Sequence, residues 1–521
     1  MLSVASQTEI PAAELASASA SRRYIPLAVW LLTLATLICV PFKVISYGYL
    51  PQDDALRHAA KAVSQREWSD ILVVRDELKM DHNPGWHWLL ARVHQTLQAD
   101  TDTLVVMAVI GLFAAALILP IFAMERPEAW AGALLVCTVA CPAIPYRVLL
   151  GRPLAVSIAV TLAVLALWTR RGRTQPSLKL MLFTTVLLAL SAWIHGSWYL
   201  FALVVAAFFL SGRTQAALAL AGCWMLGSFL GASLTGHPFA FLANAVRIGR
   251  SCFNDAPLQR MLVSEFLPSG GSVFTVMTVA AMLMWRRMSG HWTPESLRHP
   301  AFILVVLGWL LGLRVIRFEA DWAAPALLLW IAFELQDHCK RHLPLDSMRR
   351  VVIGAGLCAA LFFAATADEN SRWSRALDTE YLSAADPEMA PWLPEKGGIV
   401  YSADMTIFYQ TFFRNPHGQW RYILGFEPTF MPADDLRIYR NIQRNFGAYE
   451  AFQPWVHKMR PEDRLILRSA SSAAPNIPQL EWHYTARELW VGRKPRIKAT
   501  GVSDGTPPNI SATAQADGSA G

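Results

Sequence analysis

Charged side chains are scarce in this sequence. Asp, Glu, Lys and Arg together make up 16% of its 521 residues, whereas soluble proteins carry roughly a quarter. Hydrophobic residues make up 54%, and the mean hydropathy is +0.31. This composition excludes an ordinary soluble protein and predicts a chain that crosses a membrane several times. The 20 Trp and 25 Phe fit the aromatic belts at the two faces of a bilayer.

The sequence also lacks the patterns of metal–thiolate and nucleic-acid-binding proteins. No CxxC pair is present and no His lies at ligand spacing from a Cys, so neither a metal–thiolate site nor a disulfide framework is expected. The net charge of +7 comes from short basic clusters between apolar runs and forms no single stripe. We interpret these charges as the loop charges that fix membrane topology, and we expect no nucleic-acid partner.

Eleven apolar runs approach or reach the length that crosses a bilayer as a helix. A hydrocarbon core of about 30 Å needs roughly 20 helical residues. The runs cover residues 25–42, 103–123, 129–146, 154–168, 179–194, 197–211, 215–235, 272–285, 300–314, 320–335 and 350–366. They predict an α-helical polytopic membrane protein with about 11 transmembrane helices.

The positions of Lys and Arg predict which side each loop faces. Arg22 and Arg23 precede the first run and indicate a cytoplasmic amino terminus, and every short loop rich in Lys or Arg then falls on that same side. We therefore expect a multi-pass protein of the bacterial inner membrane. Its expected parts are a cytoplasmic segment 1–23, a transmembrane domain 24–367 with a long periplasmic first loop 43–102, a periplasmic domain 368–496 and a disordered tail 497–521.

Both large external pieces contain secondary-structure patterns. In the first loop, amphipathic patterns predict helices over 54–64 and 86–97. In the carboxyl-terminal piece, strand-like runs at 398–401 and 464–467 and a helical stretch at 434–446 predict a small α+β domain.

Ionisable residues crowd at three places close to the expected outer membrane face. At the first, Asp53 and Asp54 lead into the first predicted helix of the loop. Asp53 is placed to cap that helix and Asp54 lies in its favourable first turn, so both have a structural explanation. The cap would also fix a carboxylate in space. Asp54 shares a helix face with Arg57 and His58 through its i,i+3 and i,i+4 spacing.

The other two places lie further along the chain. Asp81 and His82 precede Pro84, and a turn before a helix explains the proline better than it explains the acid and the imidazole. Arg317 and Glu319 lie in a charged stretch between the ninth and tenth runs, where interfacial anchoring is the structural alternative. Further basic or titratable residues at the same external level are Arg147, Arg152 and His195.

Together these groups suit a substrate with a phosphate head and an apolar tail. Arginine makes bidentate contacts to phosphate while such a tail stays in the bilayer. A carboxylate beside the phosphate can take a proton from an attacking hydroxyl. The residues alone therefore predict a site for a lipid-linked anion at the outer membrane face.

This arrangement resembles the GT-C superfamily of membrane glycosyltransferases, which includes protein O-mannosyltransferases, lipid A aminoarabinose transferases and oligosaccharyltransferase subunits. In these enzymes an acidic pair follows the first span, as Asp53 and Asp54 do here. A motif of the type His-Pro-Pro or Lys-Pro-Pro precedes a helix of their first loop, and residues 81–85 (Asp-His-Asn-Pro-Gly) are similar to it. Residues 317–326 resemble the late basic and aromatic stretch that enters a Pro-containing span.

The resemblance implies an inverting glycosyltransferase that moves a sugar from a polyprenyl-phosphate donor to an acceptor glycan, lipid or protein outside the membrane. It implies Asp53 as the catalytic base, with Asp54 supporting it or binding a divalent cation, Mg²⁺ or Mn²⁺; Asp81 is the other candidate ligand of that cation. The candidates for binding the donor phosphate are Arg314, Arg317, His82, Arg147 and Arg152. The other residues expected in the pocket are Asp81, Arg57, His58, His195 and Glu319.

The competing class is a transporter or flippase of a lipid-linked anionic glycan, which would also line a cavity with arginine. Transporters tend to show two related halves with broken helices at the midplane, and this sequence shows no internal repeat. A simple anchor that presents the carboxyl-terminal domain needs only one span, which leaves the other apolar runs unexplained. The sequence therefore favours the transferase.

Overall fold

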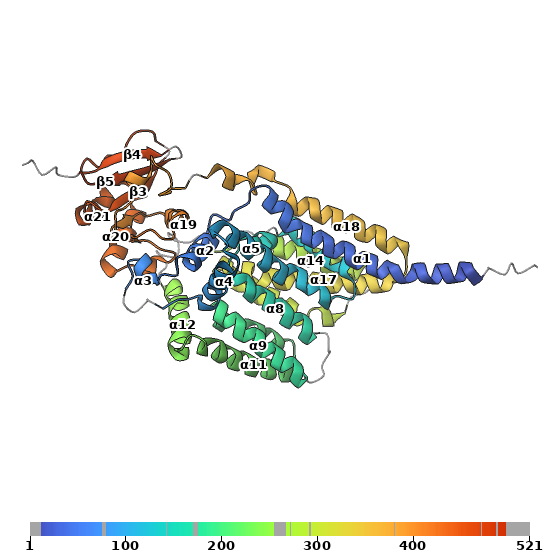
Figure 1. Ribbon diagram of the computed structural model, residues 1–521. Coiled ribbons are helices and arrows are strands. Elements are labelled where there is room, and N and C mark those ends of the chain that lie inside the picture. Colours follow the sequence, from blue (N-terminus) through green and yellow to red (C-terminus); the bar gives the residue numbers. More distant parts are fainter. Residues whose placement is uncertain are drawn as a thin grey trace, which may run out of the picture.

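The computed structural model describes residues 12–75, 80–141, 143–169, 176–254, 267–270, 272–290, 293–379, 381–469, 471–485 and 488–495. The expected disordered tail 497–521 and the first residues of the expected segment 1–23 lie outside the described residues. Figure 1 shows a bundle of long helices with a smaller part of helices and strands at one end, and the amino-terminal helix extends from the opposite end.

The bundle is built from the apolar runs of the sequence. Its main helices are α1 (Ala12–Ser46), α5 (Thr101–Phe113), α6 (Pro127–Ala140), α8 (Leu154–Thr169), α9 (Leu178–Ile194), α10 (Ala202–Leu210), α11 (Thr214–Ser233), α14 (Ser272–Met288), α15 (Pro300–Gly312), α17 (Ala324–His342) and α18 (Met348–Thr366). Every expected run falls on a helix or on consecutive helices, which confirms their helical nature. Four described helices are long and apolar enough to cross a membrane, namely 24–46, 101–123, 214–233 and 348–366. The number of spans remains a prediction.

Two of these helices change their winding. α5 continues as a π-helix, η2 (Ala114–Ile118), and then as a 3-10 helix, η3 (Leu119–Ala123). α17 is preceded by the short helix α16 (Ile316–Phe318) and by a π-helix, η7 (Glu319–Ala323). Pro120 and Pro325 lie at these two places, and a proline cannot donate the backbone hydrogen bond that a regular α-helix needs.

The expected run 129–146 is wrong at its carboxyl end. α6 ends at Ala140, and a separate helix, α7 (Ala143–Leu149), follows. The expected runs leave only residues 147–153 between two spans, whereas in the structure α7 reaches Leu149 and residues 150–153 form a short connection before α8. This connection carries Arg152 and, through α7, Arg147 to the site described below.

The basic loops that share one expected side meet at one end of the bundle. Arg350 at the start of α18 donates Nε and Nη2 to the two carboxylate oxygens of Glu128 on α6, at 2.6 and 3.0 Å, and both side chains are fully buried. Lys340 on α17 lies 2.8 Å from Glu125. The first loop and the carboxyl-terminal part lie at the other end (Figure 1). Which end faces the cytoplasm remains a prediction.

The first loop folds into three helices, α2 (Asp54–Ser64), α3 (Trp68–Ile71) and α4 (Pro84–Leu97). The helix expected over 54–64 is confirmed, and the one expected over 86–97 begins two residues earlier, with a proline in the first turn, where it costs no hydrogen bond. Both the apolar and the polar face of α2 are buried. The buried residues of its polar face are Arg57, His58 and Lys61. Buried polar groups need partners, and these define the site.

The carboxyl-terminal part is a small α+β unit, as expected. Its strands are β1 (Ile399–Tyr401), β2 (Arg421–Tyr422), β3 (Arg464–Arg468), β4 (Glu481–Thr485) and β5 (Leu489–Arg493), and its helices are α19 (Met405–Arg414), α20 (Ala433–Arg444) and α21 (Gln453–Lys458). The sheet has the order β2-β1-β3-β5-β4, with β1 parallel to β2 and β3 and the remaining pairs antiparallel. The predicted strands and the predicted helix are confirmed, the helix ending two residues earlier than expected.

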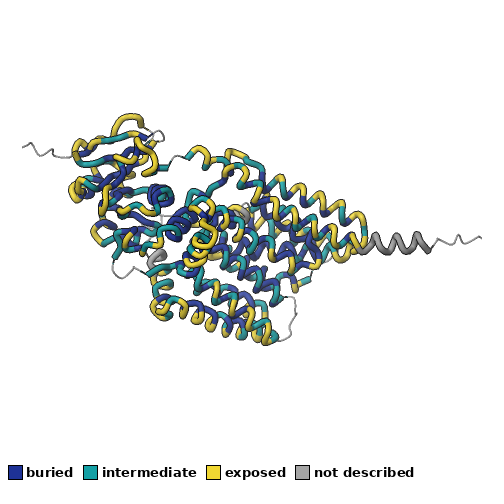
Figure 2. Tube along the Cα trace, in the orientation of Figure 1, coloured by how far each residue is buried: buried dark blue, intermediate teal, exposed yellow. Residues whose placement is uncertain are grey.

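This unit is bound tightly to the first loop. The Val73 backbone N–H donates to the carbonyl of Tyr422 at 2.9 Å, and that of Arg75 donates to the carbonyl of Phe430 at 3.0 Å. Arg414 on α19 pairs with Asp102 on α5 at 2.6 Å. Figure 2 shows buried residues continuing from the bundle through α2 into this part. The first loop and the carboxyl-terminal part, which are far apart in the sequence, therefore pack together as one layer.

Two kinds of element were not expected. α12 (Pro238–Asn254) lies between the expected runs 215–235 and 272–285, where the sequence predicts a connection outside the membrane. It stands at the same end as the first loop (Figure 1). Short 3-10 turns also connect the larger elements, namely η4 (Trp198–Phe201), η6 (Pro294–Ser296), η8 (Glu369–Ser371), η9 (Arg375–Asp378), η10 (Ala390–Trp392), η11 (Pro428–Phe430) and η12 (Tyr449–Phe452).

Candidate functional site

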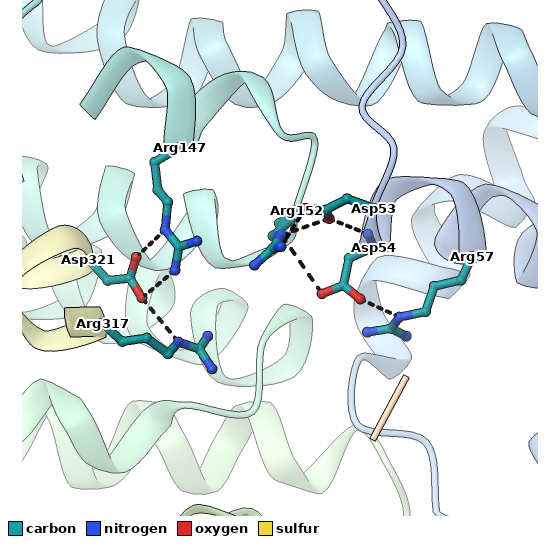
Figure 3. A network of polar contacts seen from close by, with 7 residues as sticks. All are labelled: Asp53, Asp54, Arg57, Arg147, Arg152, Arg317 and Asp321. Carbon is teal, nitrogen blue, oxygen red and sulfur yellow. Dashed lines mark hydrogen bonds and ion pairs between the residues drawn. The ribbon is translucent and has the colours of Figure 1, made fainter. Parts of the chain in front are cut away.

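Asp53 and Arg152 form the first ion pair of the site (Figure 3). Asp53 is the N-cap residue of α2, as expected, and its side chain accepts from the Asp54 backbone N–H. Arg152 donates Nε to Asp53 Oδ1 at 2.8 Å, and its Nη2 pairs with Oδ2. Gly151 has φ +67°, and a Cβ there would lie 3.1 Å from the Cβ of Ala55 on α2. The turn that carries Arg152 therefore approaches α2 this closely because it contains glycine.

The neighbouring acid, Asp54, is held by a different arginine. Arg57 Nε donates to Asp54 Oδ1 at 2.8 Å, and Arg152 Nε lies 4.0 Å from Oδ2. Burial raises the pKa of Asp54, but the charges of Arg57 and Arg152 and the hydrogen bonds from Arg57 and Tyr409 outweigh it and hold that pKa well below its usual range. Asp54 is thus ionised, and each acid of the pair has its own arginine.

Asp321 on η7 joins two further arginines (Figure 3). Arg147 on α7 donates Nε to Oδ1 at 2.7 Å and Nη2 to Oδ2 at 3.1 Å. Arg317 on α16 donates Nε to Oδ2 at 3.4 Å. The Asp321 side chain is 3% exposed, whereas that of Arg317 is 33% exposed. The buried carboxylate therefore orients Arg317, whose side chain stays partly exposed.

A chain of imidazoles runs from the second sequence cluster to α2. Asp81 Oδ2 lies 2.6 Å from His87 Nδ1, and His87 Nε2 lies 2.7 Å from His58 Nδ1. Burial lowers the pKa of both histidines. With both rings neutral, His87 donates to Asp81 and accepts from His58, which leaves the lone pair on His58 Nε2. That atom is buried and has no hydrogen-bond partner in the described structure.

Two other histidines, His82 and His195, are also held neutral. His82 stacks on Phe430, with ring centroids 5.1 Å apart, and burial lowers its pKa to about 4. Burial and the charge of Arg317 lower the pKa of His195, at the end of α9, to about 3. Positive charge at neutral pH therefore comes from the arginines, and the histidines act as neutral hydrogen-bonding groups.

A cavity of about 190 Å³ opens between these elements. It is lined by residues of the first loop, of α8, α12 and the 195–200 turn, of the segment from Val315 to Trp322, and of the carboxyl-terminal part. Its lining residues are His82, Asn83, Leu154, His195, Gly196, Ser197, Tyr199, Leu200, Ala245, Gly249, Val315, Arg317, Phe318, Asp321, Trp322 and Glu427.

Glu427 is the contribution of the carboxyl-terminal part to this cavity. It lies between β2 and η11, immediately before η11, and is half-buried. Thr429 Oγ1 donates to its Oε1 at 3.3 Å. Burial raises the pKa of Glu427 to about 7, although the Thr429 hydrogen bond and the charge of Arg317 act against the shift.

The residues predicted from the sequence divide into three groups. His82, Arg317 and His195 line the cavity. Asp53, Asp54, Arg57, Arg147 and Arg152 lie in the ion-pair networks of Figure 3. Asp81 and His58 belong to the histidine chain.

The two remaining predicted residues belong to none of these groups. Arg314 is exposed and is not among the lining residues. Glu319 is buried on η7 and accepts a hydrogen bond from Thr275 Oγ1 of α14 at 2.7 Å. Asp321 and Glu427 were missed as site residues. The sequence could have indicated Asp321, because it follows Arg317 by one helical turn. It could not have indicated Glu427, because the position of that residue depends on how the carboxyl-terminal part docks.

The described structure does not bring the two expected cation ligands together. Asp54 and Asp81, the expected ligands, are bound separately to Arg57 and His87. Among the residues that the structure describes, no three His, Cys, Asp or Glu side chains are grouped to hold a metal ion. Guanidinium groups stand against both carboxylates of the acidic pair, where a shared cation would need to bind, so we derive no step through a metal.

A second pocket, of about 380 Å³, lies within the bundle, and all of its lining residues are apolar. It is lined by Ala115, Leu119, Pro120, Phe122, Ala123, Val156, Ala159, Val160, Ala163, Ala166, Leu167, Phe183, Leu187, Leu190 and Ile194. These residues lie on the irregular end of α5 and on α8 and α9. Ile194 immediately precedes His195 of the polar cavity, so the two spaces approach one another at the end of α9.

Comparisons with known proteins find matches among solved structures. No family model matches the chain, and no curated protein matches it. The Archaeoglobus fulgidus oligosaccharyltransferase, tethered through a disulfide bond to an acceptor peptide containing the NVT sequon, is 12% identical and aligns with a TM-score of 0.44, covering 84% of this chain and 69% of that one.

Proposed function

We propose that the protein is an inverting glycosyltransferase that moves a sugar from a polyprenyl-phosphate donor to an acceptor. The observation that carries this proposal is the pairing of two spaces: a polar cavity with an arginine in its wall, and an apolar pocket that ends beside it at Ile194 and His195. A lipid phosphate needs both environments. The reaction is placed at the membrane face where the first loop and the carboxyl-terminal part meet, which we assign to the periplasm of a bacterial inner membrane.

The apolar pocket suits the tail of the donor. It lies along α8 and α9, between Phe183 and Ile194 on α9 and between Val156 and Leu167 on α8. Each of these stretches spans about 16 Å at the rise of an α-helix. A polyprenyl chain lying there would bury apolar surface on three sides and would bring its phosphate to the end of α9.

Arg317 is the proposed phosphate ligand. It lines the cavity, and Asp321 orients it. Arg147 in turn holds Asp321 through two hydrogen bonds. A phosphate oxygen bound here gains a charge-assisted hydrogen bond, which stabilises the charge that develops when the sugar–phosphate bond breaks. His82 and His195 would contribute neutral hydrogen bonds.

The acidic pair supports the site electrostatically. Asp53 and Asp54 hold Arg152 and Arg57 at its edge, and the charge of Asp54 acts on both His195 and Glu427. Inversion in a single displacement needs one proton acceptor. The resemblance names Asp53 for that role, with Asp54 beside it, and the experiments below test both.

The alternative remains a transporter or flippase of a lipid-linked anionic glycan, since it would use the same two spaces. The test is an assay in proteoliposomes with a panel of polyprenyl-phosphate sugars, in which sugar transfer and released polyprenyl phosphate are measured together. A transferase releases one carrier phosphate for each sugar transferred. Movement of the intact lipid-linked sugar across the bilayer, without released carrier phosphate, would replace the transferase with a transporter.

A further inference from the structure

The segment that carries Glu427 is fixed to the first loop at both ends. At its start, the Tyr422 carbonyl accepts from the Val73 N–H at 2.9 Å. At its end, the Phe430 carbonyl accepts from the Arg75 N–H at 3.0 Å, and Arg75 Nε donates to the Met431 carbonyl at 2.7 Å. The chain between these bonds has little freedom, so the direction of Glu427 into the cavity is built into the fold.

Side-chain contacts fix the same segment from both sides. The Arg57 guanidinium lies 3.9 Å from the ring centroid of Phe426, directly before Glu427. His82 stacks on Phe430, three residues after Glu427. Asp54, which binds Arg57, is therefore connected to the Glu427 segment through the Arg57–Phe426 contact. A residue held this way by two separate elements is placed for a specific contact.

Three other acids in or beside the cavity, Asp53, Asp54 and Asp321, are already engaged by arginine. Asp53 is bound by Arg152 and Asp54 by Arg57. Asp321 lines the cavity but is bound by Arg147 and Arg317. Glu427 also lines the cavity, and within the described part of the chain its hydrogen bonds come from Thr429 and it forms no ion pair. An acid held by guanidinium groups is a weak base, whereas Glu427 lies at the cavity wall with no guanidinium paired to its carboxylate in the described structure.

We propose that Glu427 is the proton acceptor of the transfer reaction. This inference rests on the proposed function. The attacking oxygen or nitrogen of the acceptor forms a bond to the anomeric carbon while the bond from that carbon to the phosphate oxygen breaks. The bonding pair leaves with the phosphate, which Arg317 stabilises, and the proton of the acceptor moves to the Glu427 carboxylate.

The surroundings of Glu427 bring the pKa of its carboxyl close to neutral pH. The charged and titratable groups around it are Arg317 from α16, Asp54 from α2, Tyr439 from α20 and the cavity residues Asp321, His82, His195 and Tyr199. The pKa of Glu427 is about 7, while those of His82 and His195 are about 4 and 3. The base form of Glu427 is therefore gained as the pH rises through about 7, and turnover should rise with it.

The test compares Glu427→Gln with Glu450→Gln, an exposed glutamate of η12 in the same part of the chain. Both variants are checked for folding by size-exclusion and thermal unfolding in detergent. Release of polyprenyl phosphate from the donor panel is then measured between about pH 5.5 and 9. General-base catalysis typically contributes about 10²- to 10⁴-fold. We expect a loss of that order for Glu427→Gln and disappearance of the rise near pH 7, with Glu450→Gln unchanged.

Binding of farnesyl phosphate gives a second readout that needs no turnover. Ionised Glu427 opposes an anion at Arg317, so the ratio of wild-type to Glu427→Gln affinity should fall as the pH rises through about 7. A folded Glu427→Gln protein with wild-type turnover, or with the same pH profile, overturns this inference and leaves the transferase intact. A wild-type protein that binds farnesyl phosphate but releases no carrier phosphate from any donor overturns the proposed function, and this inference with it.

Discussion

Arg152 donates to both carboxylate oxygens of Asp53, which lies 99 positions earlier in the chain. The pair connects the turn before α8 to the start of α2, so it attaches the first loop to the bundle. Each side chain is 19% exposed. A bidentate pair fixes direction as well as distance, and Arg152 also stands within 4.0 Å of Asp54. The acidic pair is therefore part of the frame that orients the site.

Asp53→Asn tests whether Asp53 only positions Arg152 or also accepts the proton in the reaction. Asparagine still caps a helix well, so α2 should form, but the charge that holds Arg152 is lost. We expect turnover to fall roughly tenfold to a hundredfold through misplacement of the site, while the rise of activity near pH 7 is retained. The measurement is the pH profile of polyprenyl phosphate release.

Asp100→Asn is the matched control, because Asp100 is likewise an N-cap aspartate, that of α5, at an exposed position. It should leave turnover unchanged. A loss of about 10³-fold or more in Asp53→Asn, together with loss of the pH dependence, would return the role of base to Asp53, as the resemblance implies. The same loss of turnover and of pH dependence in Asp54→Asn would assign the role of base to Asp54.

Substitution of Arg317 tests the phosphate site. A planar guanidinium holds both Asp321 and a phosphate oxygen through fixed donors, which a lysine cannot reproduce. Arg317→Lys should therefore be nearly as harmful as Arg317→Ala, with a loss on the order of 10²-fold in turnover. Arg444→Ala, at an exposed position of α20, is the control for loss of one positive charge. Near-normal turnover in Arg317→Lys would identify Arg317 as an interfacial anchor.

The apolar pocket makes a separate prediction about the donor tail. Ala163 on α8 lines it, and Ala163→Phe would occupy the space that the tail needs. Each methylene displaced from an apolar site is worth about 0.8 kcal/mol, so KM for a long-chain donor should rise about tenfold. KM for a short-chain donor of the same sugar should hardly change. An equal rise for both donors would mean that the tail binds elsewhere.

Local patterns predicted the elements far better than they predicted the site. The cap at Asp53 and the apolar periodicity were enough to give α2 its bounds, because both signals lie within a few residues. α12 was missed because its mixed polarity resembles that of a loop. Glu427 was beyond reach, since its place in the cavity depends on backbone hydrogen bonds between residues more than three hundred positions apart.

The orientation of the chain can be tested by cysteine labelling. Ser472 lies at an exposed position of the carboxyl-terminal part, and Ser177 lies directly before α9 at the other end of its helix from His195. In a background without the native cysteines, Ser472→Cys should react with an impermeant thiol reagent in cells whose outer membrane is permeable to it. Ser177→Cys should react only after the inner membrane is opened. Labelling of position 177 from outside would reverse the topology.

The buried pair between Arg350 and Glu128 should dominate the stability of the opposite end of the bundle. Both side chains are fully buried, and removal of one partner of such a pair typically costs about 3–5 kcal/mol, because the other charge is left uncompensated. Arg126 also lies 3.8 Å from Glu128. Loss of the carboxylate therefore leaves two guanidinium groups facing each other, whereas loss of Arg350 leaves Glu128 with Arg126 nearby. Thermal unfolding in detergent should rank Glu128→Gln below Arg350→Met, with the double variant Glu128→Leu/Arg350→Met recovering much of the loss. The reverse order would show that Arg126 does not compensate Glu128.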